Sequence, residues 1–201
     1  MKNTVIYVHG KGGSANEAEH YIPLFPNDRV IGFNYFAENP WEAKEEFPRF
    51  FANQRKNGES IILIANSIGA FFSISSLDET TVDKAFLISP VVDMEKLISN
   101  MMATENVTER ELKEKSEIPT HFGETLSWRY LCYVREHPVS WKVKTDILYG
   151  EYDNLTSLKT ISDFAGKTGA NLTVMPHGEH FFHTREQMDF LDGWIKNALV
   201  K

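Results

Sequence analysis

Apolar residues gather in short runs along the chain, and these runs predict six β-strands. The runs are residues 5–8, 30–33, 61–65, 85–89, 146–149 and 172–175. Most are continuously apolar rather than alternating with polar positions, which is typical of strands covered on both faces.

Helical patterns separate the runs. Residues 41–57 form one such pattern, which stops at Gly58, a residue type that commonly ends helices. Pro48 within it predicts either a kink or a less regular first half of this helix. The last helix opens on Thr184 and Gln187, which fit a capping box. Further helices are predicted over residues 68–77, 155–164 and 185–199.

Strands that alternate with helices predict an α/β protein with a doubly wound, mostly parallel six-stranded sheet. The alternation is interrupted between Pro90 and Lys144, where no strand is evident and helical patterns cover residues 94–102 and 108–116. A long insertion in a sheet protein is usually functional. We therefore expect one domain over residues 1–201, with residues 91–144 as an inserted helical cap.

Residues 60–77 hold no charged side chain and are just long enough to be considered as a membrane span. Asn66, Ser67 and Gly69 interrupt the run in its middle, so a strand, a turn and a buried helix in succession account for it better. The N-terminal segment has too short an apolar run for a signal peptide. We expect a cytoplasmic protein without a membrane span.

Charge and cysteine content reduce the range of possible functions further. The 21 Lys and Arg residues stand against 28 Asp and Glu, a formal net charge of −7. Nucleic-acid-binding proteins normally carry a basic surface, so nucleic acid is not an expected partner. Cys132 is the only cysteine, which excludes an internal disulfide and gives no indication of an oxidising compartment.

Chemically useful residues follow four of the predicted strands. Ligands of open parallel sheets bind beyond the carboxyl ends of the strands, so the residues that directly follow the strands are the main candidates for a functional site. They are the glycine-rich loop His9-Gly10-Lys11-Gly12-Gly13-Ser14, Ser67, Asp153, and the three histidines His177, His180 and His183.

Ser67 lies between an apolar strand and an apolar helix with almost no loop, so the chain must turn sharply there. Small neighbours at Ala65 and Gly69 suit such a turn. The turn would project the hydroxyl outward, and the helix would direct its first N–H groups at a developing anion. The alternative is a serine that only caps the helix beginning at Ile68.

At this point the sequence resembles the α/β-hydrolase superfamily. Ala65-Asn66-Ser67-Ile68-Gly69 is similar to its nucleophile elbow, G-x-S-x-G, with alanine in place of the first glycine. The family order Ser…Asp…His recurs as Ser67, Asp153 and His180, and the loop at residues 9–13 resembles the oxyanion loop. The resemblance covers nearly the whole chain and implies a compact α/β-hydrolase fold.

The resemblance implies roles for individual residues. His180, within a pattern similar to the family's Gly-x-His-aromatic, would be the base, with His177 next and His183 packed on the last helix. Asp153 would be the acid, with Asp93 as runner-up and Glu151 third; its alternative role is to cap the helix predicted from Leu155.

The oxyanion donors would be the backbone N–H groups of Lys11 and Ile68. His9 belongs to the oxyanion loop and would orient it by hydrogen bonding. The Lys11 side chain either faces solvent or meets an anionic substrate.

Two other site types fit less well. The glycine-rich loop lacks the G-x-x-x-x-G-K-[ST] spacing of a phosphate-binding loop. His177, His180 and His183 are spaced by threes, but Pro176 and Gly178 make a regular helix there unfavourable, so the three would not share a face for zinc. We expect neither a metal nor a cofactor.

The expected function is that of a serine hydrolase, carboxylesterase-like, that cleaves small or medium acyl esters through an acyl-enzyme on Ser67. A thioesterase, peptidase or acyltransferase would use the same residues, and a non-catalytic binding protein on the same fold is the competing class. Apolar side chains of the insertion could line an acyl pocket or form a small core of their own: Met101, Met102, Phe122, Trp128, Tyr130, Tyr133 and Trp141.

Overall fold

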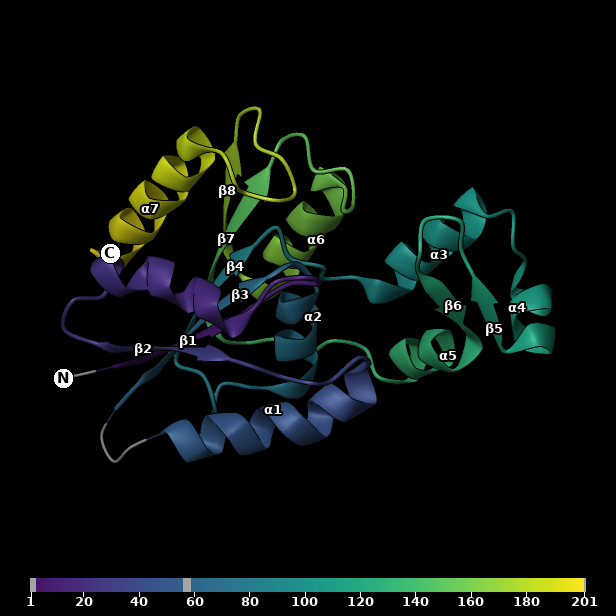
Figure 1. Cartoon of the computed structure of the whole chain (residues 1–201), viewed down its shortest axis with the longest axis horizontal. Coiled ribbons are helices and arrows are strands. Elements are labelled where there is room, and N and C mark those ends of the chain that lie inside the picture. Colours follow the sequence, from purple (N-terminus) through teal and green to yellow (C-terminus); the bar gives the residue numbers. More distant parts are fainter. Residues whose placement is uncertain (1–2, 56–58, 201) are drawn as a thin grey trace. The chain divides into compact units, whose positions relative to one another are not determined.

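All six predicted strands form one parallel sheet in a computed structural model, which describes residues 3–55 and 59–200. The strand order is β2-β1-β3-β4-β7-β8, and each neighbouring pair is parallel (Figure 1). The strands are β1 Thr4–Val8, β2 Arg29–Phe33, β3 Ile61–Asn66, β4 Lys84–Ile88, β7 Lys144–Gly150 and β8 Asn171–Met175. The prediction of a doubly wound parallel sheet is confirmed.

One face of the sheet packs against η1 (Ala15–Leu24) and α7 (Arg185–Leu199). Every second strand residue points to this face, as the pleat requires, and joins apolar side chains of the two helices. Trp194 of α7, for example, meets the Phe86 ring of β4 edge-on at 5.5 Å. The strand residues of this core are Val5, Tyr7, Ile62, Ile64, Phe86, Ile88, Leu148 and Met175.

An aromatic cluster connects β2 to α1 (Pro40–Gln54) and α2 (Ser67–Ser76). Phe47 is fully buried, and its ring lies 4.9 Å from Phe33, 5.3 Å from Tyr35 and 6.2 Å from Phe72. These tilted and edge-on contacts are favourable geometries for aromatic pairs. The cluster fixes α1 against α2, and α2 in turn begins at Ser67.

The end predicted for α1 is wrong. The helix runs through Pro48 and ends at Gln54, with Arg55 as its C-cap, whereas the pattern favoured residue 57. Gly58, the predicted terminating residue, lies outside the described residues. The helix begins where Asn39 accepts a hydrogen bond from the Glu42 N–H, which satisfies one of its first donors.

The start predicted for α6 is wrong as well. The helix spans Leu158–Thr168 and begins three residues later than the apolar pattern indicates. Asp153 accepts hydrogen bonds from the N–H groups of Leu155 and Thr156, which holds these residues in a loop, and Ser157 caps the helix instead. By contrast, α7 matches its predicted bounds and its capping box at Thr184 and Gln187 is confirmed.

The 3₁₀ helix η1 was not predicted. It lies between β1 and β2 and contains Pro23, which interrupts any helical pattern that a sequence reading could follow. Ser14 followed by Glu17 is the signal that could have located its start, since this spacing is typical of a helix N-terminus.

Residue contacts divide the chain into two compact units. The second unit is Asp93–Val139, and the first comprises the described residues on either side of it. The second unit holds α3 Met94–Thr104, α4 Glu109–Lys115, β5 Glu117–Pro119, β6 Thr125–Ser127 and α5 Trp128–Glu136.

The insertion contains two strands, contrary to prediction. β5 and β6 form an antiparallel pair in which Ile118 lies opposite Leu126, and Gly123 turns the chain between them at φ 85°. Leu112, Leu126 and Leu131 are fully buried, so the unit has a small apolar core. Trp141 is not part of this unit: it lies in the first one, where its indole N–H donates to Thr145 Oγ1.

The uncharged residues 60–77 are accounted for by β3 and α2, with Ser67 at their junction. Within residues 3–55 and 59–200, no helix has both the length and the apolar character needed to cross a membrane.

Replacing Phe47 by alanine is expected to lower the free energy of unfolding by about 3–5 kcal/mol, because a fully buried ring is lost and a cavity remains. Urea denaturation measures the change. Phe36→Ala is the matched control, since the Phe36 side chain is 82% exposed, and its effect should stay within about 0.5 kcal/mol. Equal effects of the two substitutions would contradict the assigned role of the aromatic cluster.

Candidate active site

Ser67, His180 and Asp153 form a continuous hydrogen-bonded chain beyond the carboxyl ends of β3, β8 and β7. Ser67 Oγ lies 2.9 Å from His180 Nε2, and His180 Nδ1 lies 2.7 Å from Asp153 Oδ2. The Asp153 side chain is completely buried and that of His180 is 19% exposed. Residues 113 and 27 positions apart in the sequence are thereby brought into direct contact.

The turn that presents Ser67 has an unusual backbone. Ser67 adopts φ 51°, in the left-handed region that non-glycine residues rarely occupy. The Val91 N–H donates to the Ser67 carbonyl at 3.1 Å and helps to hold this conformation. Such a strained residue persists only where the surrounding structure determines it, and functional sites are where it is commonly found.

Gly69 is needed for the close approach of α2 to the end of β1. A Cβ at this position would lie 2.2 Å from the His9 carbonyl oxygen, so no side chain fits there. We expected Gly69 to make room for Ala65, but its nearest neighbours belong to His9 and Val8. The absence of a side chain brings the N-terminus of α2 against the glycine-rich loop.

Asp153 uses both carboxylate oxygens. Oδ1 accepts from the N–H groups of Leu155 at 2.8 Å and Thr156 at 3.0 Å, and Oδ2 faces His180. The two roles considered for Asp153 therefore coexist: it organises the loop before α6 and orients the imidazole. Its backbone is held by a hydrogen bond from the Asp153 N–H to the Gly150 carbonyl at 2.9 Å.

The Asp153 and His180 loops are packed backbone to backbone. A Cβ at Gly150 would lie 2.4 Å from the Glu179 carbonyl oxygen, and a Cβ at Gly178 would lie 3.1 Å from the Gly150 Cα. The Tyr152 N–H donates to the Gly178 carbonyl at 2.7 Å. These contacts set the distance between the two loops, and hence between the carboxylate and the imidazole.

The other two histidines have partners elsewhere. His177, at φ 58°, directs Nδ1 to the Tyr152 hydroxyl at 2.7 Å. His183 directs Nδ1 to the Phe181 carbonyl at 2.8 Å, and its N–H donates to Gln187 at the start of α7, where we expected it to pack.

The other two acids are also engaged elsewhere. Asp93 accepts from the Lys96 N–H at 2.9 Å and caps α3. Glu151 accepts from the His177 N–H at 2.8 Å. The carboxylate that the structure brings to His180 is that of Asp153.

The glycine-rich loop forms a tight turn beside Ser67. The Gly13 N–H donates to the Gly10 carbonyl at 3.2 Å, and Gly12 adopts φ 74°, which leaves Lys11 and Gly12 as the central residues of the turn. A Cβ at Gly10 would lie 3.0 Å from Ser67 Cβ, so the loop backbone passes directly against the serine.

Ile68 is the second residue of α2, so its N–H has no partner within the helix and points beyond the helix N-terminus. The loop that carries Lys11 passes this same end of α2, because Gly69 lies against His9.

Tyr35 supports the loop and was missed by the sequence reading. Its ring stacks on that of His9 at 4.4 Å, and its hydroxyl donates to the His9 carbonyl at 3.0 Å. Burial, with a smaller contribution from Glu46, raises the pKa of Tyr35 to about 12, so the hydroxyl remains a donor. Tyr35 follows β2, a strand end that carried no recognised motif. His9 Nδ1 lies 2.8 Å from the Gly10 carbonyl, in line with a loop-orienting role.

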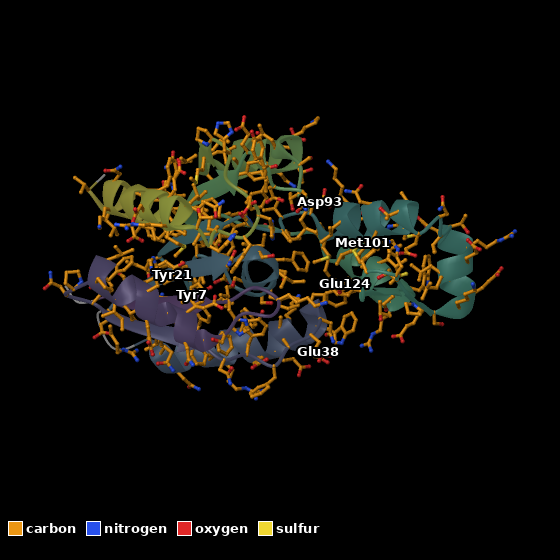
Figure 2. The ribbon with its side chains drawn as sticks, turned by 45° about the horizontal axis from the view of Figure 1, so that its top comes forward. Tyr7, Tyr21, Glu38, Asp93, Met101 and Glu124 are labelled. Carbon is orange, nitrogen blue, oxygen red and sulfur yellow. The ribbon has the colours of Figure 1, made fainter. Side chains whose placement is uncertain are left out.

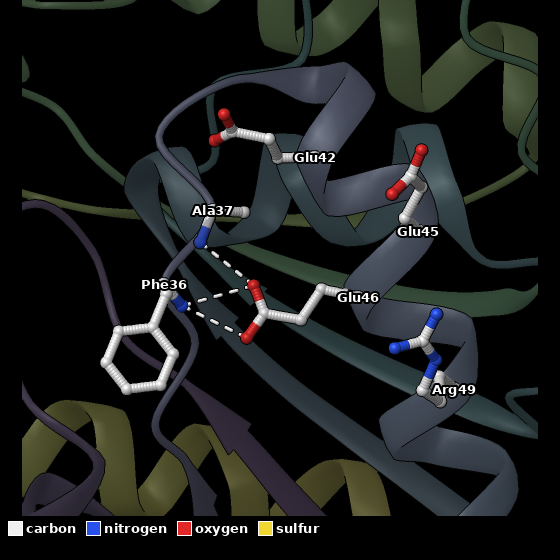
Figure 3. A pocket seen from close by; sticks show the side chains of 6 residues that line it. All are labelled: Phe36, Ala37, Glu42, Glu45, Glu46 and Arg49. Atoms are coloured by element: carbon white, nitrogen blue, oxygen red, sulfur yellow. Dashed lines mark hydrogen bonds between the residues drawn. The ribbon is translucent and has the colours of Figure 1, made fainter.

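A hollow of about 250 Å³ lies apart from these residues, at the N-terminal half of α1 (Figure 3). It is lined by Phe36, Ala37, Glu42, Glu45, Glu46 and Arg49. Figure 3 shows the Glu46 carboxylate accepting from the N–H groups of Phe36 and Ala37, so this side chain organises the loop after β2. None of Ser67, Asp153 and His180 lines the hollow.

A metal site is not evident in the described part of the chain. Within it, no group of three or more His, Cys, Asp or Glu side chains is placed to hold an ion. His177, His180 and His183 instead direct Nδ1 to three separate partners, a hydroxyl, a carboxylate and a carbonyl.

Comparisons with known proteins place the architecture in context. No family model matches the chain. One curated relative, named Putative esterase/lipase 3, from Mycoplasma genitalium, is 29% identical over 103 residues, which is 45% of this chain and 37% of that protein. The match thus spans well under half of the relative's length.

Solved structures match over almost the entire chain. Mouse alpha/beta hydrolase domain-containing protein 10 gives a TM-score of 0.76 at 14% identity, covering 98% of this chain and 89% of that one. Est1E from Butyrivibrio proteoclasticus gives 0.75 at 12% identity, with 99% and 87% covered. The thioesterase domain from the curacin biosynthetic pathway gives 0.61 at 14% identity, with 96% and 91% covered. With its parallel sheet, its left-handed serine turn and these structural relatives, the chain has the α/β-hydrolase fold.

Proposed function

We propose that this chain is a serine hydrolase that cleaves small or medium acyl esters through an acyl-enzyme on Ser67. The observation that carries the proposal is the hydrogen-bonded chain from Ser67 Oγ through the His180 imidazole to the buried Asp153 carboxylate. A serine hydroxyl is a poor nucleophile until a base takes its proton, and this arrangement supplies the base and its orienting acid.

In the proposed reaction, Ser67 Oγ attacks the ester carbonyl carbon while His180 Nε2 accepts the hydroxyl proton. The imidazolium then protonates the departing alkoxide, which leaves as an alcohol. Water attacks the acyl-enzyme with the same base, and the acid product and free Ser67 are released. Asp153 keeps the Nδ1 proton of His180 directed at Oδ2, so that Nε2 faces the serine, and stabilises the positive charge.

The oxyanion of each tetrahedral intermediate is assigned to the backbone N–H groups of Ile68 and Lys11. Support comes from the position of Ile68 at the N-terminus of α2 and from the Gly10 backbone passing against Ser67. Preorganised donors of this kind are usually the largest single contribution to acyl transfer, and losing one costs about 10²–10³ in rate. The chemistry needs no cofactor.

An ester is the favoured substrate class because the similar protein from Mycoplasma genitalium carries the name esterase/lipase. A thioester is the second candidate, supported by the likeness to a thioesterase domain. Peptidase and acyltransferase activities share the same residues. That residues 91–144 form an inserted cap of the domain remains part of this proposal.

Labelling by a fluorophosphonate probe tests the nucleophile. The wild-type chain should be labelled and Ser67→Ala should not, because the probe bonds to an activated serine oxygen. Ser75→Ala is the control, since Ser75 lies on the same helix and donates only to the Phe72 carbonyl. A wild-type chain that is neither labelled nor hydrolytic would point to the non-catalytic binding protein, and labelling of Ser67→Ala would move the nucleophile elsewhere.

Asp153→Asn tests the acid. Asn retains an oxygen for the N–H groups of Leu155 and Thr156, but its amide turns a donor toward His180 Nδ1 and favours the wrong tautomer. We expect kcat for a p-nitrophenyl ester to fall by about 10⁴ with little change in thermal midpoint. Asp93→Asn, at the helix-capping acid, is the comparison; if it abolishes turnover and Asp153→Asn does not, the acid is misassigned.

Chelation separates the proposed mechanism from metal-dependent hydrolysis. Prolonged dialysis against EDTA should leave the rate of ester hydrolysis unchanged, because no step of the proposed reaction involves an ion. A loss of activity that zinc restores would overturn the proposal and return His177, His180 and His183 to consideration as ligands.

A further inference from the structure

We propose that the turn formed by Ser89, Pro90 and Val91 aims one of the two assigned oxyanion donors, the Ile68 N–H, by holding the carbonyl of the same peptide unit. The inference rests on the proposed hydrolase function and makes Ser89 and Val91 positioning residues, without a chemical step of their own. The turn belongs to the first compact unit and ends before Asp93, which begins the second unit and is labelled in Figure 2.

The Ser67 carbonyl and the Ile68 N–H belong to one planar peptide unit. In a trans peptide these two groups point in opposite directions, so a contact that fixes the carbonyl also fixes the direction of the N–H. The Val91 N–H donates to the Ser67 carbonyl at 3.1 Å. It therefore orients the peptide from the end opposite to the oxyanion and leaves the Ile68 N–H available.

This contact comes from outside the helix that it steadies. Ser67 and Ile68 are the first two residues of α2, and helix ends fray. Ser67 also has φ 51°, far from the helical value near −60°. A hydrogen bond from the segment after β4 adds a constraint at the residue where the helix alone constrains the backbone least.

Ser67 and Ser89 leave the sheet at the same level of two neighbouring strands. Asn66 of β3 is paired with Ile88 of β4, and each serine is the next residue along its chain. Both serines have left-handed backbones, at φ 51° for Ser67 and φ 42° for Ser89. Strained residues of this kind persist where surrounding contacts determine them, and here the two lie on adjacent strands that a hydrogen bond joins.

The left-handed conformation of Ser89 changes which neighbouring strand the chain bonds. The Ser89 N–H continues the sheet and donates to the Leu148 carbonyl of β7 at 2.8 Å. Residues two apart in a regular strand have the same orientation, so a continued strand would direct the Val91 N–H to β7 as well. Val91 instead bonds Ser67 at the end of β3, on the other side of β4. The turn at Ser89 redirects this donor.

Ser89 is unfavourable in two respects that a glycine would avoid. A left-handed backbone is disfavoured for any residue with a Cβ, and the Ser89 Oγ is buried without a hydrogen-bond partner among the described residues. Ser89 is fully buried and Val91 is 1% exposed. The packing around the turn therefore holds it in this conformation, which makes it a rigid support for the Ser67 carbonyl.

Loss of the hydrogen bond from Val91 would leave the Ile68 N–H in place but less well aimed. Hydrogen bonds weaken steeply as they depart from linearity, and complete loss of an oxyanion donor costs about 10²–10³ in rate. A misplacement of about 1 Å costs about 10². The loss should fall mainly on kcat rather than on KM, because the oxyanion charge develops in the transition state.

Replacing Val91 by its α-hydroxy acid tests the proposal in the full-length chain. An ester oxygen takes the place of the N–H, and the side chain is retained. The fluorophosphonate probe titrates the active sites, and kcat per titrated site, KM for a p-nitrophenyl ester and Ki for a trifluoromethyl ketone are then measured. We expect kcat per site to fall about 10–100-fold, KM to change less than about twofold, and ketone affinity to fall in parallel with kcat.

The same replacement at Val82 is the matched control. Val82 is 1% exposed, like Val91, and its N–H donates to the Asp78 carbonyl at 2.9 Å in the turn that precedes β4. The control loses one backbone hydrogen bond of the same kind and should retain wild-type kcat per site. Equal kcat per site in the two variants would overturn the proposal, as would a loss confined to the number of titratable sites. An inactive, unlabelled wild-type chain would instead overturn the proposed function.

Two substitutions at Ser89 separate the effect of its backbone from that of its hydroxyl. Ser89→Thr keeps a hydroxyl, but its β-branched side chain is poorly suited to the left-handed region. Ser89→Gly loses the hydroxyl and adopts this region readily. We expect Ser89→Thr to lower kcat per site about 10-fold and Ser89→Gly to lower it less. The reverse order would assign the effect to the hydroxyl and overturn the role of the turn.

Discussion

The close approach of α2 to the end of β1 is the constraint on which the rest of the site depends. It requires Gly69, because a Cβ there would collide with the His9 carbonyl, and it leaves Ser67 in a left-handed conformation at the start of the helix. Every other feature of the site is arranged around this junction. The glycine-rich loop lies against Ser67, Tyr35 holds that loop from β2, and the Val91 N–H holds the Ser67 carbonyl from the segment after β4.

A second close approach sets the opposite half of the site. Gly150 and Gly178 bring the loops after β7 and β8 together backbone to backbone, and these loops carry Asp153 and His180. Asp153 is also tied to its own loop through Oδ1, so the Oδ2 atom faces His180 in a fixed direction. The distance between carboxylate and imidazole thus depends on the close approach of the two loops, which Gly150 permits.

The glycine-rich loop is likewise held in place by contacts with a more rigid part of the fold, in this case side chains from β1 and η1. Tyr7, on a strand in the interior of the sheet, cannot move without disturbing the core face shared with η1 and α7. A loop anchored to it through Glu17 takes on that rigidity, although the loop itself is exposed at Lys11 and Gly12. Sites built on regular elements hold their geometry more precisely than sites built on loops, and hydrogen bonds from a strand through Glu17 to the Ser14 N–H extend that precision to the loop.

The sequence by itself determined the six strands, the parallel sheet and the bounds of α7, because continuous apolar runs and helical spacing report directly on burial at neighbouring positions. It also placed Ser67, Asp153 and His180 at strand ends, since these follow apolar runs closely. The family resemblance ranked His180 first among the three histidines and Asp153 first among the acids, and the tertiary structure is what brings these two side chains into contact with each other and His180 into contact with Ser67. These pairings depend on loop conformations set by contacts between distant residues, such as Gly150 with Glu179. The start of α6, the helix η1, the short strands β5 and β6 and the hydrogen bond between Tyr7 and Glu17 escaped prediction for the same reason: side-chain hydrogen bonds and pairings across the chain outweighed the local pattern.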